Sequence, residues 1–379
     1  METEEALIKL AFAMDKAMEA YEANEDTIFD NEIEAQKFRY DSKYVKSLSW
    51  GNNNICIYPG CTEHAIRASH TIQKSTSLSS IAEGRHVLAP RFNYRREHYN
   101  LSLVGVNEAS TFPGFCTAHE QIFARFEDKK DFIDEQDFQL QIFRTICREI
   151  IQNRRSLDSS VYRKDQYTKF RDKTLNELIK KEAQKQDIDL NSLTSFKHKY
   201  NDRRITFMAN HIKKTNRYLG KLGKFNDAIF NDLTKNKVQK IYFDAINMDW
   251  VIPCSLAGKG SIVVKTKSKL LVVDVILNVL PYEDKTYVII ATHHKYKAHL
   301  KEYLNRFMQH PFTMITMVES WMLYGSDHWF IKPSVWENLD KPIQKELIDE
   351  MFSEKNINAI SPHFIFKELR LSLEKLLDI

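Results

Sequence analysis

Glycine and proline are both scarce in this chain of 379 residues, which contains 10 glycines and 9 prolines. Their scarcity argues against collagen-like regions and long flexible linkers, and we find no internal repeat with a period of roughly 20–50 residues. No stretch offers about 18 consecutive apolar residues, so a membrane span is not expected. The first residues, Met-Glu-Thr-Glu-Glu, lack the basic start and apolar run of a signal peptide.

Cysteine is also rare, because five cysteines are too few to form a disulfide scaffold in a chain of this length. Three of them stand close to histidines, which favours metal binding over disulfide formation. Together with the missing signal peptide and membrane span, this predicts a cytoplasmic protein. The net charge of +4 permits nucleic-acid binding without requiring it.

The pattern of apolar residues predicts an α+β protein built from four segments. The first is helical, the second combines short strands with clustered Cys and His, the third is almost entirely helical, and the last contains strands followed by helices. Cys147 and Cys254 fall on apolar patterns, so both are expected to be buried. The four segments are residues 1–50, 51–127, 128–236 and 237–379.

The last segment should form an antiparallel sheet with helices packed on it. Turns are predicted at Gly258-Lys-Gly260 and at residues 281–285. The expected strands are residues 241–246, 260–265, 270–277 and 286–291, and the expected helices are residues 296–308, 311–323 and 342–352. Earlier in the chain, residues 86–89 and 101–106 are also predicted to be strands.

Four residues have the spacing of a structural zinc site. Cys56 and Cys61 flank a Pro-Gly pair that can fold into a tight turn, and Cys116 and His119 are spaced to start a helix. Zinc takes four thiolate and imidazole ligands in such sites. Residues 62–115 leave room for a hairpin, which is typical of the treble-clef arrangement. His64 or His70 could replace His119 as the fourth ligand.

In the order of these features the chain resembles the zinc-supported branch of the HNH (ββα-metal) nucleases. The Cys pair, the run Ser69-His70-Thr-Ile and the pair Cys116/His119 match the family's ligand pairs and base segment, and Glu120 stands in the place of the final metal ligand. The chain differs where Ser69 replaces an Asp or His, where Glu120 replaces a His, and where the middle Asn is missing. Asn100 and Asn107 are candidate substitutes.

This resemblance implies a mechanism for phosphodiester cleavage. His70 would act as the general base and Glu120 would hold a catalytic Mg²⁺ or Mn²⁺, with Glu127 on the same helix face as an assisting carboxylate. Similar modules occur in uncharacterised prokaryotic proteins, some of which act in antiphage defence. The resemblance therefore implies a metal-dependent endonuclease. Each of these residues also has a purely structural interpretation. His70 could be a hydrogen-bonded structural histidine, Glu120 a carboxylate at the start of a helix, and Glu127 a surface carboxylate.

Basic residues interleaved with aromatics suggest contact with DNA or RNA around the first hairpin. The candidates are Arg85, Arg91, Arg95 and Arg96, and an ordinary solvated surface is the alternative. The third segment is also basic between residues 162 and 224. His293, His294 and His299 could bind metal or phosphate at a strand end.

Two further functions remain open at this point. The zinc module could bind nucleic acid without cleaving it, or the zinc could only stabilise a small fold in a protein-interaction module. The last segment, rich in tryptophan, could contribute the surface for a protein partner. Neither the oligomeric state nor the activating signal is encoded in a pattern that we recognise.

Overall fold

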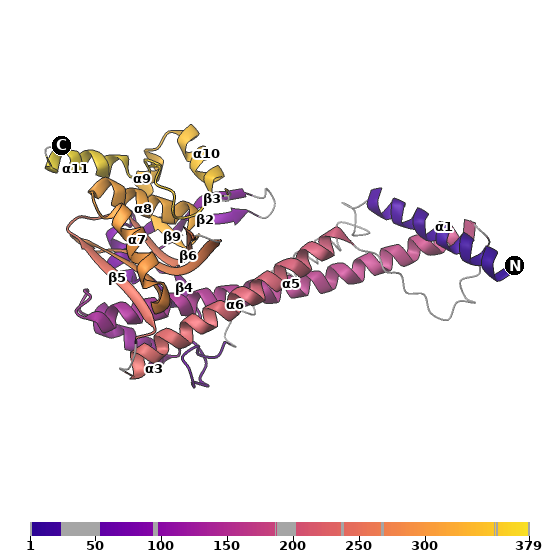
Figure 1. The fold of residues 1–379 in the computed structure, drawn as a ribbon, viewed down its shortest axis with the longest axis horizontal. Helices are drawn as coiled ribbons and strands as arrows, with labels where there is room; N and C mark the ends of the chain where they lie inside the picture. The colour runs from indigo at the N-terminus through magenta and orange to yellow at the C-terminus, as the bar shows by residue number, and fades with distance from the viewer. Residues whose placement is uncertain are drawn as a thin grey trace. The chain divides into compact units, whose positions relative to one another are not determined.

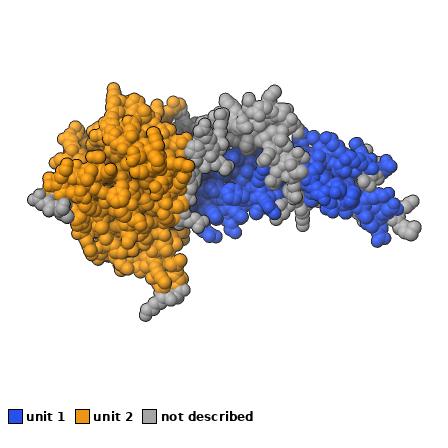
Figure 2. Space-filling model, turned by 90° about the horizontal axis from the view of Figure 1, so that it is seen from above, with its two compact units in different colours: residues 1–49, 153–219 blue, residues 50–152, 220–379 orange. Residues whose placement is uncertain are grey.

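The computed structural model describes residues 2–23, 54–93, 98–185, 187, 202–235, 239–266, 269–351, 353 and 355–377. The chain divides into two compact units (Figure 2): unit 1 comprises residues 1–49 and 153–219, and unit 2 comprises residues 50–152 and 220–379. Two long helices, α5 (Glu135–Lys185) and α6 (Arg203–Lys235), contribute residues to both units. The four-segment division predicted from the sequence stays a prediction.

In unit 2, a mixed α+β fold is built on an antiparallel sheet, which confirms the predicted fold class. The sheet has seven strands in the order β3-β2-β9-β6-β7-β8-β5. Their bounds are β2 His86–Asn93, β3 His98–Gly105, β5 Ile241–Met248, β6 Cys254–Lys265, β7 Leu270–Pro281, β8 Thr286–His293 and β9 Trp329–Ile331. The strands predicted at residues 86–89, 241–246, 260–265, 270–277 and 286–291 all lie within these elements, and the strand predicted at 101–106 ends one residue earlier, at Gly105.

The interior strand β7 is covered on both faces. Leu277 packs in one core with Tyr303 and Trp321, which come from helices α7 (Lys297–Phe307) and α8 (Pro311–Tyr324). The next residue, Asn278, points to the opposite face, where its side chain accepts a hydrogen bond from Gln141 of α5 at 3.0 Å. Because successive side chains of a strand alternate, the two faces have different partners (Figure 1). Three shorter helices follow: α9 Pro333–Glu337, α10 Lys341–Glu350 and α11 Lys367–Leu377.

The turn predicted at Gly258-Lys-Gly260 was wrong, because these residues lie inside strand β6. Both glycines allow close packing instead. A Cβ atom at Gly258 would lie 2.0 Å from the Ser326 hydroxyl oxygen, and one at Gly260 would lie 2.8 Å from Leu277. Glycine inside a strand often marks such a close approach. The turn predicted at residues 281–285 is confirmed, because the Tyr282 N–H donates to the Lys285 carbonyl at 2.8 Å.

The β2–β3 hairpin lies between the two predicted pairs of zinc ligands in sequence, yet it belongs to the large sheet. Leu88 of β2 pairs with Ile331 of β9, and Ile331 pairs in turn with Cys254 of β6. The hairpin turn that precedes it, Gly84-Arg85, has positive φ at both residues, as a type I′ turn requires. The zinc-ligand segment is therefore joined to the C-terminal strands through β9.

A second, two-stranded sheet lies beside the predicted ligands. Strand β1 (Ser69–His70) pairs with β4 (Thr111–Phe112), and β4 leads to the short helix α3 (Thr117–Glu120). Elements η2 (Gln121–Phe123) and α4 (Ala124–Glu127) continue the chain towards α5, and a π-helical turn η1 (Lys74–Leu78) follows β1. The ββα nuclease arrangement that the resemblance implied stays a prediction.

Unit 1 combines helix α1 (Glu2–Ala23) with the unit 1 residues of α5 and α6. Asp202 starts α6, since its carboxylate accepts the N–H groups of Arg204 and Ile205 at 2.7 and 3.1 Å, and it also accepts the Tyr21 hydroxyl at 3.0 Å. In the described ranges, no helix combines the length and apolarity that crossing a membrane requires. Cys147 and Cys254 are fully buried, as predicted.

Candidate metal centre

A tight turn brings the first two cysteines together. The Cys61 N–H donates to the Tyr58 carbonyl at 3.0 Å across Pro59-Gly60, and Gly60 has a φ of +81°. These are the features of a type II turn, which takes Pro and then Gly at its central positions. The Cys56 N–H donates to the Glu63 carbonyl at 2.8 Å, which closes a small hairpin around the turn. The predicted tight turn is confirmed.

The second pair of ligands is placed by the start of helix α3. Cys116 is the N-cap residue of α3, and His119 lies in its only turn. The preceding chain is held by Ser69, whose hydroxyl accepts the N–H of Phe115 at 3.3 Å. The ring of Phe112 folds over Gly114, where a Cβ atom would lie 2.1 Å from the ring. Strands β1 and β4 therefore fix the position from which Cys116 reaches the site.

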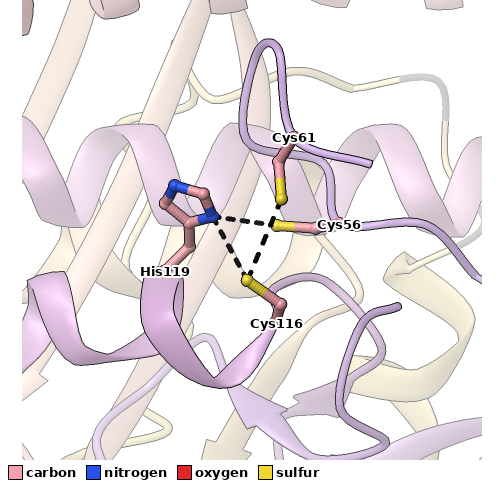
Figure 3. A group of neighbouring side chains, drawn as sticks. All are labelled: Cys56, Cys61, Cys116 and His119. Atoms are coloured by element: carbon pink, nitrogen blue, oxygen red, sulfur yellow. Dashed lines mark hydrogen bonds between the residues drawn. The ribbon is translucent and has the colours of Figure 1, made fainter. Parts of the chain in front are cut away.

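The four side chains converge on one point (Figure 3), with all ligand atoms within 4.8 Å of one another. His119 Nδ1 lies 3.2 Å from Cys116 Sγ and 3.5 Å from Cys56 Sγ, and Cys61 Sγ lies 3.9 Å from Cys116 Sγ. For zinc bonds of about 2.0–2.3 Å at a tetrahedral centre, neighbouring ligand atoms are about 3.5–3.8 Å apart. The cluster therefore has the composition and dimensions of a closed structural zinc site.

The surroundings of the cluster also suit a metal. The ring of Tyr58 stacks on His119 with centroids 3.9 Å apart and planes 12° apart, which fixes the imidazole. Burial raises the pKa of Cys56 to about 11. Burial also acts to raise the pKa of Cys116, but the backbone N–H groups of His119 and Ala118 outweigh it and lower that pKa. A bound Zn²⁺ would supply the positive charge that stabilises all three thiolates.

Of the three candidate histidines, the structure brings His119 to the sulfurs. His64 is exposed and forms an isolated bridge with Ile55, and His70 lies on β1 outside the ligand group. The Cys56, Cys61, Cys116 and His119 cluster is compatible with the predicted structural zinc.

A second polar cluster contains an arginine that the sequence analysis missed. Arg144 of α5 is fully buried and donates from Nη1 to Glu127 and from Nη2 to Glu120, each at 2.5 Å. Its guanidinium also lies over the ring of Phe123, 4.3 Å from the centroid. Despite burial, which acts in the opposite direction, the charges of Glu127 and Glu120 raise the pKa of Arg144. We call Arg144, Glu120, Glu127 and His70 the Arg144 cluster.

The surroundings of His70 in this cluster lower its pKa. Burial lowers its pKa, and the positive charges of Arg144 and Lys74 lower it further, whereas Glu127 and a backbone hydrogen bond to Val106 oppose the shift. Its Nε2 atom is buried and has no hydrogen-bond partner among the described residues. The same holds for Oε2 of Glu120 and Nε of Arg144. A small polar species such as water would satisfy these atoms.

In the Arg144 cluster, the guanidinium already pairs with both carboxylates that would bind a catalytic divalent cation. A divalent cation would have to share Glu120 and Glu127 with Arg144, whose charge opposes it while the two carboxylates attract it. We therefore derive no chemical step through Mg²⁺ or Mn²⁺, and the catalytic roles of His70 and Glu120 stay predictions.

The structure describes two of the four arginines that were predicted to contact nucleic acid. Arg85 and Arg91 are exposed on the β2 hairpin, while Arg95 and Arg96 lie outside the described residues. Asn107, a candidate for the middle Asn, is exposed, and Asn100 lies on β3 opposite Arg91. Neither asparagine belongs to the Arg144 cluster. The sequence does contain one indication that Arg144 is buried. Its neighbours Ile142, Phe143 and Ile146 are apolar and lie on a buried turn of the helix.

Comparison of the chain with protein-family models, with curated proteins and with solved structures found no match.

Proposed function

We propose that the chain binds nucleic acid through a zinc-stabilised, HNH-like module that does not cleave its ligand. The observation that favours binding over cleavage is the bonding of Arg144 to both Glu120 and Glu127. A buried guanidinium at this place gives the carboxylates a permanent partner. The module then keeps the framework of a nuclease while its cation position is taken by the protein itself.

Surface features beside the module support nucleic acid as the ligand. Arg91 is exposed on β2, and its cross-strand neighbour Asn100 lines a cavity of about 430 Å³ between β3 and α10. Tyr99, Lys341, Lys345 and one acidic residue, Asp349, also line this cavity. An aromatic ring beside ammonium groups suits a base and its phosphate. Cross-strand neighbours project from the same face of a sheet, so Arg91 extends this basic surface.

The binding proposal is tested by fluorescence anisotropy with labelled single-stranded and duplex DNA and RNA at low and rising salt. We expect affinity that falls steeply with salt and intact probes after incubation with Mg²⁺ or Mn²⁺. The double variant Arg85→Gln/Arg91→Gln should bind more weakly, whereas Lys367→Gln/Lys375→Gln on α11 removes the same charge elsewhere and should bind as the wild type does. Absence of binding to every probe at low salt contradicts the proposal.

A metal-dependent endonuclease is the second candidate, and the unpaired Nε2 of His70 and Oε2 of Glu120 favour it. A neutral His70 could take the proton of an attacking water at Nε2. This activity requires Arg144 to release at least one carboxylate when substrate binds. Cleavage by the wild type that His70→Gln abolishes, with zinc content and melting temperature unchanged, would favour this candidate. The antiphage role suggested by the sequence resemblance belongs with this second candidate.

A further inference from the structure

A run of basic residues joins strand β8 to helix α7. Residues 294–301 read His-Lys-Tyr-Lys-Ala-His-Leu-Lys and contain three lysines, two histidines and no acidic residue. They form the short element η4 (His294–Tyr296) and the first turns of α7. Because β8 neighbours the edge strand β5, the run concentrates positive charge at one side of the sheet.

Aromatic rings hold the three ammonium groups in place. Lys297 and Lys301 are four residues apart on α7, and their Nζ atoms lie 4.7 and 5.8 Å from the ring centroid of Tyr242 on β5. Lys295 Nζ lies 4.8 Å from the ring centroid of Tyr296. Cation–π contacts of this kind are favourable and restrict long side chains. The lysines therefore form an ordered group, which we call the lysine patch: Lys295, Lys297 and Lys301.

Among the described residues, the lysine patch has no carboxylate in an ion pair with it. None of its three lysines forms such a pair, whereas Lys221, Lys259 and Lys285 elsewhere in unit 2 do. Asp244, close to Tyr242 on β5, instead accepts the Tyr242 hydroxyl at 2.8 and 3.0 Å. Lys295 and Lys301 are exposed. The patch is thus a cation cluster that an external anion can reach.

We propose that the lysine patch is a second contact surface for the phosphate backbone of the nucleic acid that the chain binds. This inference rests on the proposed function. The ammonium groups already cover the aromatic rings, so the patch suits phosphates and not stacked bases, and its contacts carry no sequence information. Other lysine-rich surfaces bind anionic lipids, and binding to vesicles distinguishes this ligand from nucleic acid.

The sheet order separates the lysine patch from the first contact surface. Strands β2 and β5 are five strand spacings apart in the order β3-β2-β9-β6-β7-β8-β5. At about 4.8 Å per spacing this is about 24 Å. Duplex DNA covers that distance with about seven base pairs, at about 3.4 Å each. A probe of about 25 base pairs or nucleotides is therefore long enough to contact both surfaces.

The test compares the triple variant Lys295→Gln/Lys297→Gln/Lys301→Gln with a control, Lys129→Gln/Lys367→Gln/Lys375→Gln, which removes three exposed lysines elsewhere in unit 2. Binding of labelled duplex and single-stranded probes is measured by anisotropy over a range of salt. We expect the patch variant to lose about 10-fold or more in affinity near 0.1 M salt, and its slope of log affinity against log salt to flatten by about 1 per lysine. The control should keep the wild-type slope, and equal melting temperatures exclude misfolding.

Two results would overturn the inference in distinguishable ways. If the wild type binds and the patch variant keeps the affinity and salt slope of the control, the patch is not a contact surface, while the proposed function stands. If the wild type binds no nucleic acid at low salt, the proposed function and the patch both fail. In that case, binding to vesicles that contain phosphatidylserine would reassign the patch to a lipid surface.

Discussion

The cluster of Cys56, Cys61, Cys116 and His119, which we call the Cys3His cluster, and the Arg144 cluster are neighbours in sequence. They differ in how the negative charge of their side chains is balanced. The first gathers three thiols and an imidazole with no cationic side chain among the ligands. The second gathers two carboxylates around a buried guanidinium that bonds to both. The first arrangement is compatible with a metal, which would balance its thiolates, whereas the second already contains a cation. Metal dependence should therefore be confined to one of the two clusters.

This contrast explains why a chain can resemble a motif in the residues that fix its fold and still differ in its chemistry. The turn at Pro59-Gly60, the β1–β4 pair and helix α3 place the four Cys and His side chains. The cation site implied for Glu120 depends instead on Arg144, which α5 brings against both carboxylates. An internal ion pair can thus occupy a position that a motif assigns to a metal ligand.

Removal of zinc should give the largest effect. Structural zinc contributes about 10 kcal/mol or more of binding free energy in small zinc domains, so chelation should lower the melting temperature of unit 2 by about 10 °C or more. Cys116→Ser should have the same effect and contain far less than one zinc ion per chain. Cys147→Ser is the matched control, because this buried cysteine is not a ligand, and it should retain one zinc ion. Metal analysis and calorimetry measure both quantities; a wild type without zinc contradicts the metal assignment.

Loss of Arg144 should give the next largest effect. Arg144→Met leaves two partly buried carboxylates without their cation, which should destabilise the fold by about 3–5 kcal/mol. Lys355 pairs with the carboxylate of Glu350, but its side chain is 54% exposed. Lys355→Met should therefore cost about 1 kcal/mol or less. Urea unfolding measures both changes.

The Arg144→Met variant also sharpens the comparison through metal binding. Once the guanidinium is removed, Mg²⁺ or Mn²⁺ should raise the melting temperature of the variant while leaving that of the zinc-loaded wild type unchanged. Equal stabilisation of both proteins by Mg²⁺ would show that Arg144 does not occupy the place of a cation.

The smallest expected effect is a pH dependence from His70. Its folded pKa lies below the ordinary value, so between that lowered pKa and about 6.5 the unfolded state binds more protons than the folded state. Stability from this group is present above about pH 6.5 and is lost as the pH falls, by at most about 1.4 kcal/mol per pH unit. His70→Gln should remove the contribution of this one group to the slope of the unfolding free energy against pH. NMR titration of the His70 ring, assigned by comparison with the variant, provides the direct measurement, and a ring that titrates at or above pH 6.5 contradicts it.

Local chemistry made the zinc ligands and most strands predictable from the sequence. Cysteines and histidines carry their ligand chemistry in their own side chains, and the Pro-Gly pair specifies its turn without distant help. By contrast, Arg144 is one of many basic residues on long helices, and only its contact with Glu120 and Glu127 distinguishes it. Its partners precede it by 24 and 17 residues.

The errors have equally physical causes. Gly258 and Gly260 resembled a turn because glycine supports both turns and close packing, and only the approach of Ser326 and Leu277 decides between them. The joining of the β2–β3 hairpin to the C-terminal strands through Ile331 leaves no local signal, since strand pairing across such a separation depends on the whole sheet.

That long-range pairing determines how long strand β2 waits for its partner strand during synthesis. Leu88 of β2 and its partner Ile331 are 243 residues apart, the difference of the two paired positions. At about 5–20 residues per second, the ribosome takes roughly 12–50 s to make the chain between them. The hairpin edge is exposed during this interval, yet Cys61 and Cys116 on either side of it are already available to a metal ion. Early zinc capture would hold the unfinished edge in a small closed loop until its partner strand arrives.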